Sequence, residues 1–289
     1  MSGLPSPENR RLRAYAPFCL IVLLTTACSP PNDGPVSVAV AVEPLAWLVG
    51  QIGGEEVAVS SVVPAGTSPE TFQPDDAQVS RLLRSRAYFR VGIPFENGDW
   101  LREIASSGRL EVVDLRRDLP AADDPHVWLS PRLLAVQARI VAATLERVDP
   151  DHAATFAARR ARLEDELAAL DDELRRTLAP LAGLPFFVYH PSWGRFADAY
   201  GLRQVAIEVE GKEPDDHHLT EIQLALRESG AKALFVQPQV QARSASAVAA
   251  ATGVRLETAD PLAHDVPANL RRFAALLVAA GPGAAEEDQ

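Results

Sequence analysis

Hydrophobic residues between 149 and 181 recur at the spacing of an α-helix, and the positions between them are mostly charged. One stripe of this segment holds Phe156, Leu163, Leu167, Leu170, Leu174 and Leu178. Asp149 and Pro150 suit the start of a helix, and Pro180 and Gly183 suit its end. The pattern therefore predicts one helix of about 30 residues, roughly 45 Å long. A helix of this length favours a rigid connection between two lobes, and a surface helix of a single domain is the alternative.

Short β-branched runs alternate with helical patterns on both sides of the linking helix, in residues 36–148 and 184–280. The expected strands are 36–42, 57–63, 87–91, 110–115, 186–189, 204–209, 233–236 and 254–257. The expected helices are 44–52, 75–85, 100–106, 193–200, 219–228, 244–252 and 267–279. Repeated βα units favour parallel sheets. The predicted fold class is α/β, with two lobes of parallel sheet flanked by helices and joined by one long rigid helix.

The first 28 residues have the pattern of a secretion signal. Arginines precede an apolar run at 18–24, and small residues then lead to Cys28. The run is too short to span a membrane, so we predict a signal peptide. Small residues before a cysteine resemble a bacterial lipobox, which implies lipidation of Cys28, although Thr25 stands where such boxes usually carry Leu. Ordinary cleavage nearby, leaving a free thiol, is the alternative.

Two polar segments lie outside the predicted lobes. Residues 29–35 are rich in Pro and Gly and are interpreted as a tether, and residues 281–289 as a disordered tail. The chain of 289 residues has two cysteines, one of them inside the predicted signal, so no internal disulfide is expected after cleavage. The net charge of −11 argues against nucleic-acid binding and is compatible with a cation ligand.

Four residues with metal-binding side chains follow predicted strands, two in each lobe. They are Glu70, His126, His190 and Asp260. Functional residues of open parallel sheets collect beyond the carboxyl ends of the strands, so we expect these four to converge on one divalent cation. Imidazole and carboxylate ligands suit zinc or manganese. Taken one at a time, each residue has an alternative role as a hydrogen-bonded or solvated loop residue.

Other polar residues are weaker candidates. His152 is expected to face solvent on the linking helix, and His217 and His218 to lie in a surface loop. His264 is close in sequence to Asp260 and stays an outside candidate. Asp124 is interpreted as a turn residue, with orientation of His126 as the alternative.

The chain resembles the zinc- and manganese-binding solute receptors of ABC transporters over nearly its whole length after the predicted signal. The resemblance lies in PAGTSPETFQP (64–74), DPHVWLSP (124–131), YHPSWGRFADAYGL (189–202), EVEGKEP (208–214), FVQPQ (235–239) and TADPL (258–262). It implies a two-lobed, exported receptor that binds one metal ion between its lobes. It also implies delivery of the ion to a membrane permease, a periplasmic or cell-surface location with a lipid anchor, and a monomer.

The resemblance assigns the ligands as Glu70, His126, His190 and Asp260. Glu70 departs from the family pattern, which usually carries His there, and no histidine lies in the loop at 116–124 where zinc-type members often have several. Two carboxylates add hard oxygen donors, so manganese stays open beside zinc. Because both imidazoles must be neutral to bind, metal affinity is expected to collapse below about pH 6.

Two other functions compete with the receptor. A metal-dependent hydrolase could use the same four residues, and a receptor for an organic solute could bind its ligand with them directly. The chain contains no HExxH, GxSxG, Walker A or GxGxxG motif, so no enzymatic activity is expected.

Overall fold

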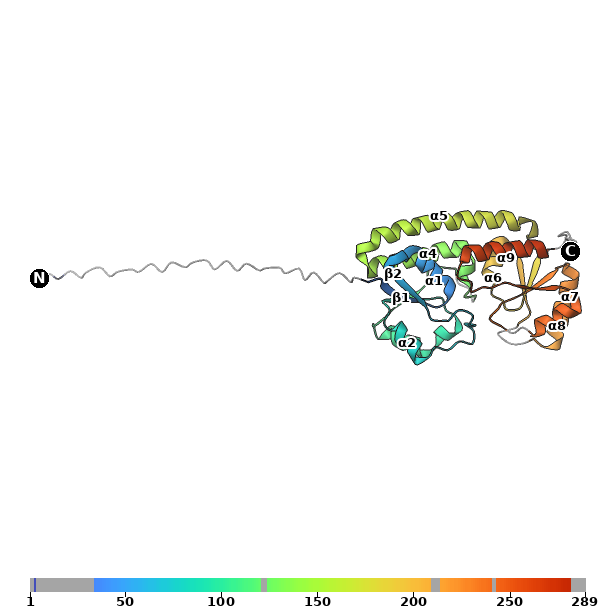
Figure 1. Ribbon diagram of the computed structural model, residues 1–289, viewed down its shortest axis with the longest axis horizontal. Helices are drawn as coiled ribbons and strands as arrows, with labels where there is room; N and C mark the ends of the chain where they lie inside the picture. The colour runs from blue at the N-terminus through green and yellow to red at the C-terminus, as the bar shows by residue number, and fades with distance from the viewer. Residues whose placement is uncertain (1–2, 4–33, 121–123, 209–213, 241–242, 282–289) are drawn as a thin grey trace. The chain divides into compact units, whose positions relative to one another are not determined.

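The computed structural model describes residues 3, 34–120, 124–208, 214–240 and 243–281 (Figure 1). The predicted signal peptide apart from residue 3, Cys28, residues 29–33 of the predicted tether and the tail from 282 lie outside the described residues. No helix in the described ranges combines the length and the apolar character needed to cross a membrane.

The first sheet has four parallel strands in the order β2-β1-β3-β4. The strands are β1 (Val36–Val40), β2 (Val57–Ser61), β3 (Ala87–Arg90) and β4 (Glu111–Asp114). Helices α1 (Glu43–Gly53), α2 (Asp76–Leu82) and α3 (Asp99–Ser106) connect them. Val38 and Val40 are fully buried, as expected of a central strand covered on both faces.

The second sheet repeats this arrangement with parallel strands in the order β6-β5-β7-β8. The strands are β5 (Pro185–Val188), β6 (Arg203–Ala206), β7 (Ala233–Val236) and β8 (Arg255–Thr258). Its helices are α6 (Gly194–Tyr200), α7 (Asp216–Ser229), α8 (Arg243–Thr252) and α9 (Val266–Ala280). All eight predicted strands are present, which confirms the predicted α/β class with two parallel sheets.

The predicted linking helix is shorter than the sequence pattern suggested. Helix α5 covers Ala153–Leu178, and short 3-10 helices at Pro150–His152 and Ala179–Leu181 flank it. The prediction of one helix over 149–181 is therefore corrected at both ends. Each 3-10 segment has proline in its first turn, and a proline cannot donate the backbone hydrogen bond that would continue an α-helix.

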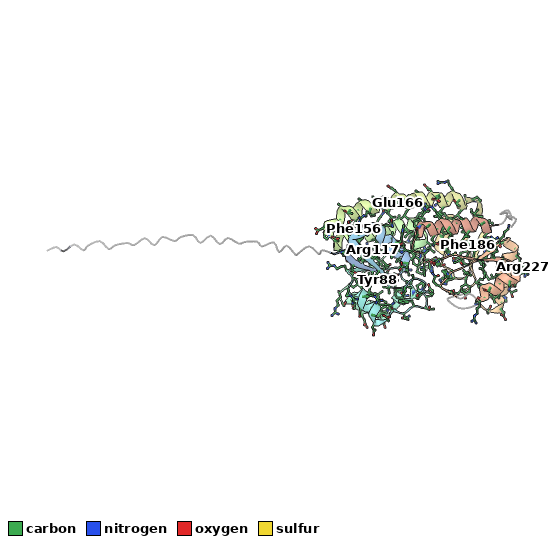
Figure 2. The ribbon with its side chains drawn as sticks, in the orientation of Figure 1. Tyr88, Arg117, Phe156, Glu166, Phe186 and Arg227 are labelled. Carbon is green, nitrogen blue, oxygen red and sulfur yellow. The ribbon has the colours of Figure 1, made fainter. Side chains whose placement is uncertain are left out.

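Helix α5 extends over the helices of both lobes (Figure 1). It packs against α1 and α4 (Pro131–Val148) of the first lobe and against α6 and α9 of the second. Phe156 is fully buried near one end of α5, and Glu166 lies on its outer side (Figure 2). Helix α4 was missing from the predicted elements, and it packs closely along α5.

Candidate metal centre

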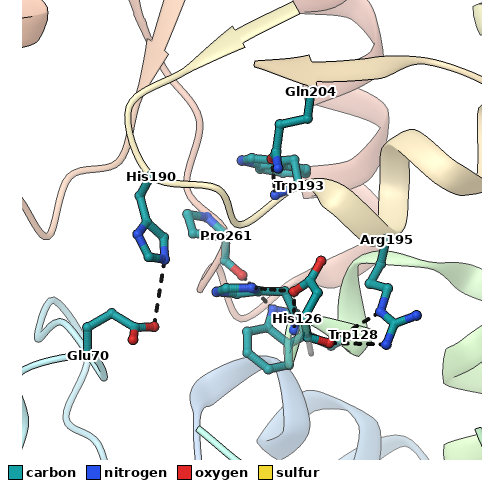
Figure 3. A network of polar contacts seen from close by, with 9 residues as sticks. Glu70, His126, Trp128, His190, Trp193, Arg195, Gln204 and Pro261 are labelled. Carbon is teal, nitrogen blue, oxygen red and sulfur yellow. Dashed lines mark hydrogen bonds and ion pairs between the residues drawn. The ribbon is translucent and has the colours of Figure 1, made fainter. Parts of the chain in front are cut away.

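Three of the four predicted ligands lie together beyond the carboxyl ends of the strands. Glu70 follows β2, His126 follows β4, and His190 follows β5 from the other lobe. One ligand atom of each lies within 4.8 Å of the others, and Figure 3 shows Glu70 and His190 facing each other. Within the described residues, no second group of three such side chains comes this close.

One ring nitrogen of His190 faces this group and makes no hydrogen bond to the described residues. Its Nε2 atom is buried and has no hydrogen-bond partner among the described residues. The Glu70 carboxylate is 3.7 Å away, which is too long for a hydrogen bond. The other nitrogen, Nδ1, lies 3.1 Å from Glu208 Oε2. A buried nitrogen without a partner is costly unless something binds it, so this atom, which faces two other metal-binding side chains, is a candidate ligand position.

His126 is oriented in the same way by Asp124. Asp124 Oδ1 is 2.7 Å from His126 Nδ1 and also accepts the backbone N–H of His126 at 2.9 Å. The turn role and the orienting role considered for Asp124 therefore both apply. Arg195 of the second lobe donates to the Asp124 carbonyl at 3.2 Å.

The electrostatics around Asp124 favour its charged form. Burial acts to raise the pKa of this carboxyl, but the hydrogen bond and charge of His126, with help from Arg195, outweigh burial and hold it below the ordinary value of 3.8. Gly194 permits this close contact between lobes, because a Cβ there would lie 2.6 Å from Asp124 Oδ2.

Asp260, the fourth predicted ligand, lies outside the group of three. It follows β8, as expected, and its Oδ1 accepts hydrogen bonds from Gln239 Nε2 at 2.7 Å and from the Leu262 N–H at 2.9 Å. It lines a separate pocket of about 180 Å³ together with Glu43 and His264.

The remaining histidines have other surroundings. His217 and His218 lie in the first turn of α7, not in a loop, and each is within ion-pair distance of Glu221. His264 pairs with Glu43 at 3.1 Å. His152 immediately precedes α5 and contacts Asp149 at 2.7 Å.

The segments that carry the predicted ligands are tied to each other across the lobes. Trp128 is fully buried two residues after His126, and its indole N–H donates to the Pro261 carbonyl at 2.7 Å (Figure 3). Glu70, His126 and His190 lie on the wall of an open cleft of about 650 Å³. The group is therefore enclosed by protein on one side and reachable from solvent on the other.

The donor set fits a divalent cation. A tetrahedral zinc site holds its ligand atoms roughly 3.5 Å apart, so a contraction of about 1 Å would bring the three atoms to binding distance. Two imidazole nitrogens and one carboxylate oxygen suit zinc and tolerate manganese. Two α/β lobes that contribute such donors to one cleft define a two-lobed metal-binding receptor.

Comparison with known proteins agrees with this class. The chain belongs to the family of zinc-uptake complex component A, periplasmic (ZnuA), whose model matches residues 38–278. The high-affinity zinc uptake system protein ZnuA of Paracoccus denitrificans (strain Pd 1222) is 33% identical over 166 residues, 56% of this chain and 51% of that protein. In that match the chain spans about half the length of its relative.

Two crystal structures of ZnuA have the same fold. One is 34% identical with a TM-score of 0.81, covering 85% of this chain and 99% of that chain. The other, a 138-173 deletion mutant with zinc bound, is 33% identical with a TM-score of 0.81, covering 86% and 99%. Family membership confirms the predicted receptor of a metal-uptake system and the expectation that the chain is not an enzyme.

Two polar residues that contact predicted ligands were missed by the sequence analysis. Glu208 contacts His190, and Gln239 contacts Asp260. Both belong to motifs that carried the family resemblance, so the resemblance marked their segments without assigning them a role.

Proposed function

We propose that this chain is an extracytoplasmic receptor that captures Zn²⁺ between its lobes and delivers it to the permease of an ABC transporter. The observation that carries the proposal is the buried, unbonded Nε2 of His190 beside His126 and Glu70. Proteins seldom leave such a nitrogen without a partner, and a cation bridging the three side chains supplies one.

Glu70, His126, His190 and Asp260 are the proposed ligands. Asp260 joins the other three by exchanging its hydrogen bond with Gln239 for the metal. The names of the relatives support zinc as the physiological ion. The two carboxylates make manganese the second candidate.

The chain acts outside the cytoplasm, in keeping with the periplasmic family to which it belongs. We place its anchor at Cys28, with residues 29–35 as the tether, and expect a monomer. In this organisation residues 36–148 and 184–280 form the two lobes, and residues 149–181 connect them.

Equilibrium dialysis against an equimolar mixture of zinc, manganese and small organic solutes, followed by elemental analysis, tests the proposal. We expect one zinc ion per chain. A His190→Ala variant should lose the ion, because one of two imidazole ligands is gone. The control His217→Ala, which removes an exposed imidazole on α7, should keep it.

Two outcomes would contradict the proposal. Retention of an organic solute without stoichiometric metal would favour the receptor for an organic ligand. Equal zinc retention by the His190→Ala and His217→Ala variants would place the metal elsewhere. Retention of manganese in preference to zinc would keep the site and change its ion.

A further inference from the structure

Glu208 lies next to His190 through both its side chain and its main chain. Its carboxylate Oε2 is 3.1 Å from His190 Nδ1, and its backbone N–H donates to the carbonyl of Tyr189 at 2.9 Å. The side chains of Glu208 and His190 are each only 10% exposed. The segment that follows β6 is thus fastened to the segment that follows β5, and the carboxylate is held against the imidazole.

The same arrangement occurs at the histidine from the other lobe. Asp124 Oδ1 lies 2.7 Å from His126 Nδ1, as Glu208 lies beside Nδ1 of His190. A carboxylate at Nδ1 keeps the proton of a neutral imidazole on that atom, so the lone pair is on Nε2. In both histidines Nε2 is then the nitrogen available to a cation.

A second carboxylate competes for the proton of His190. Glu70 lies on the opposite side of the ring, with Oε1 3.7 Å from Nε2. If the proton were on Nε2, that nitrogen would donate toward Glu70 and would have no lone pair for a metal. The position of one proton therefore decides whether Nε2 of His190 offers a lone pair to a cation or directs an N–H toward Glu70.

We propose that Glu208 is a positioning residue that keeps this proton on Nδ1 and so holds His190 ready to bind the ion. The identity of the ion rests on the function proposed above. Carboxylates behind metal-binding histidines commonly contribute 10- to 100-fold to metal affinity. Glu208 is expected to contribute within that range although it does not touch the metal.

Zinc affinity, measured by competition with a chromophoric chelator, tests the first consequence. We expect Glu208→Leu to weaken binding about 10- to 100-fold, and Glu208→Gln to weaken it less, because its amide oxygen can still accept from Nδ1. The control Glu228→Leu, at an exposed position of α7, should bind as the wild type does. Unchanged zinc affinity in Glu208→Leu would overturn the proposal.

Nitrogen NMR of the imidazole rings, in the presence of a chelator and at mildly alkaline pH, tests the second consequence without zinc. We expect the Nδ1-protonated form of His190 in the wild type and a shift toward the Nε2-protonated form in Glu208→Leu. His126 keeps Asp124 in both proteins, so its unchanged tautomer reports an intact fold. If Glu208→Leu fails to fold, the smaller shift expected for Glu208→Gln provides the measurement.

The two measurements separate this inference from the proposed function. A chain that binds no zinc, but whose His190 changes tautomer with Glu208, contradicts the function and supports the positioning role. A wild-type His190 protonated on Nε2 contradicts the positioning role, whichever metal the chain binds.

Discussion

Asp124 shows how one short side chain can serve both local structure and a binding site. Its Oδ1 accepts the backbone N–H and approaches the ring Nδ1 of the same histidine, His126. The first contact fixes the turn before the short helix Val127–Leu129, and the second fixes the imidazole ring. Since the pKa of this carboxyl is lowered in the folded protein, the charged form of Asp124 stabilises the fold.

This charge makes a pH-dependent contribution to stability. A depressed folded pKa means that the unfolded chain binds the proton more tightly, so the contribution is complete above the ordinary value of 3.8 and is lost as the pH falls through the lower folded value. We expect Asp124→Asn to reduce the free energy of unfolding by about 1 to 3 kcal/mol near pH 6. The reduction should shrink below pH 4.

Urea unfolding of the wild type and variant at a series of pH values, with a metal chelator present, measures this difference. Asp118→Asn is the matched control, because the Asp118 side chain is 61% exposed and should give little difference at any pH. A destabilisation by Asp124→Asn that stays constant from pH 6 to pH 3 would contradict the assigned role of the charge.

At the scale of single residues, the sequence indicated where candidate ligands lie in the fold better than which side chains contact them. Glu70, His126 and His190 were chosen as candidates because each follows a predicted strand of a parallel sheet, where functional residues collect. Glu208 and Gln239 were not, because Glu208 was placed inside the predicted strand 204–209 and Gln239 carries an amide, although their partners are only 18 and 21 residues away along the chain. Which side chains meet at that separation depends on strand order, which hydrophobic spacing does not encode.

At the scale of elements, the strands were predictable and one helix was not. Helix α4 packs against α1 and α5, and its exposed positions, Arg132, Arg139 and Arg147 among them, recur along one side of the helix. Its polar residues Gln137 and Thr144 are buried, which weakens the periodic signal. The polar residues on the buried side of α4 therefore obscured a helix that does have an exposed polar stripe.

The start of α7 was misplaced for a different reason. The sequence analysis assigned His217 and His218 to a loop, yet the helix begins at Asp216. The Asp215 side chain accepts the N–H of His218 at 2.8 Å and caps the first turn. The polar residues 213–218 were interpreted as a loop, but Asp215 is the N-cap of α7 and the helix begins directly after it.

The buried side chain of Gln137 on α4 is expected to lower the stability of the protein. The side chain is fully buried, and neither its oxygen nor its nitrogen has a hydrogen-bond partner among the described residues. An unsatisfied buried polar group costs roughly 1 to 3 kcal/mol, so Gln137→Leu should raise the free energy of unfolding by about that amount. Chemical denaturation provides the measurement.

The same exchange at a half-buried helical position supplies the control. Gln223 lies on α7, and Gln223→Leu should change stability by no more than about 0.5 kcal/mol. A lower stability of Gln137→Leu would mean that the amide has a partner, such as an internal water, that compensates its burial.

At the scale of residues 34–281 together, the two lobes are fastened by more than one element. Asp171 of α5 accepts from Arg132 of α4 at 2.8 Å and from Tyr200 of α6 at 3.2 Å, so one buried carboxylate joins both lobes. The bond from Trp128 to Pro261 adds a second tie near the proposed metal site. These contacts favour small rotations of the lobes over a wide opening, and a contraction of about 1 Å would bring the ligand atoms of Glu70, His126 and His190 to binding distance.

The proposed site requires imidazoles from both lobes to bind one ion. A crystal structure of the zinc-loaded protein, with anomalous diffraction measured at the zinc absorption edge, tests it most directly. We predict a single strong peak about 2.0 to 2.1 Å from Nε2 of both His126 and His190, with Glu70 and Asp260 oxygens completing the coordination. A zinc peak that contacts only one of these histidines, or neither, would rule out a site shared by the two lobes.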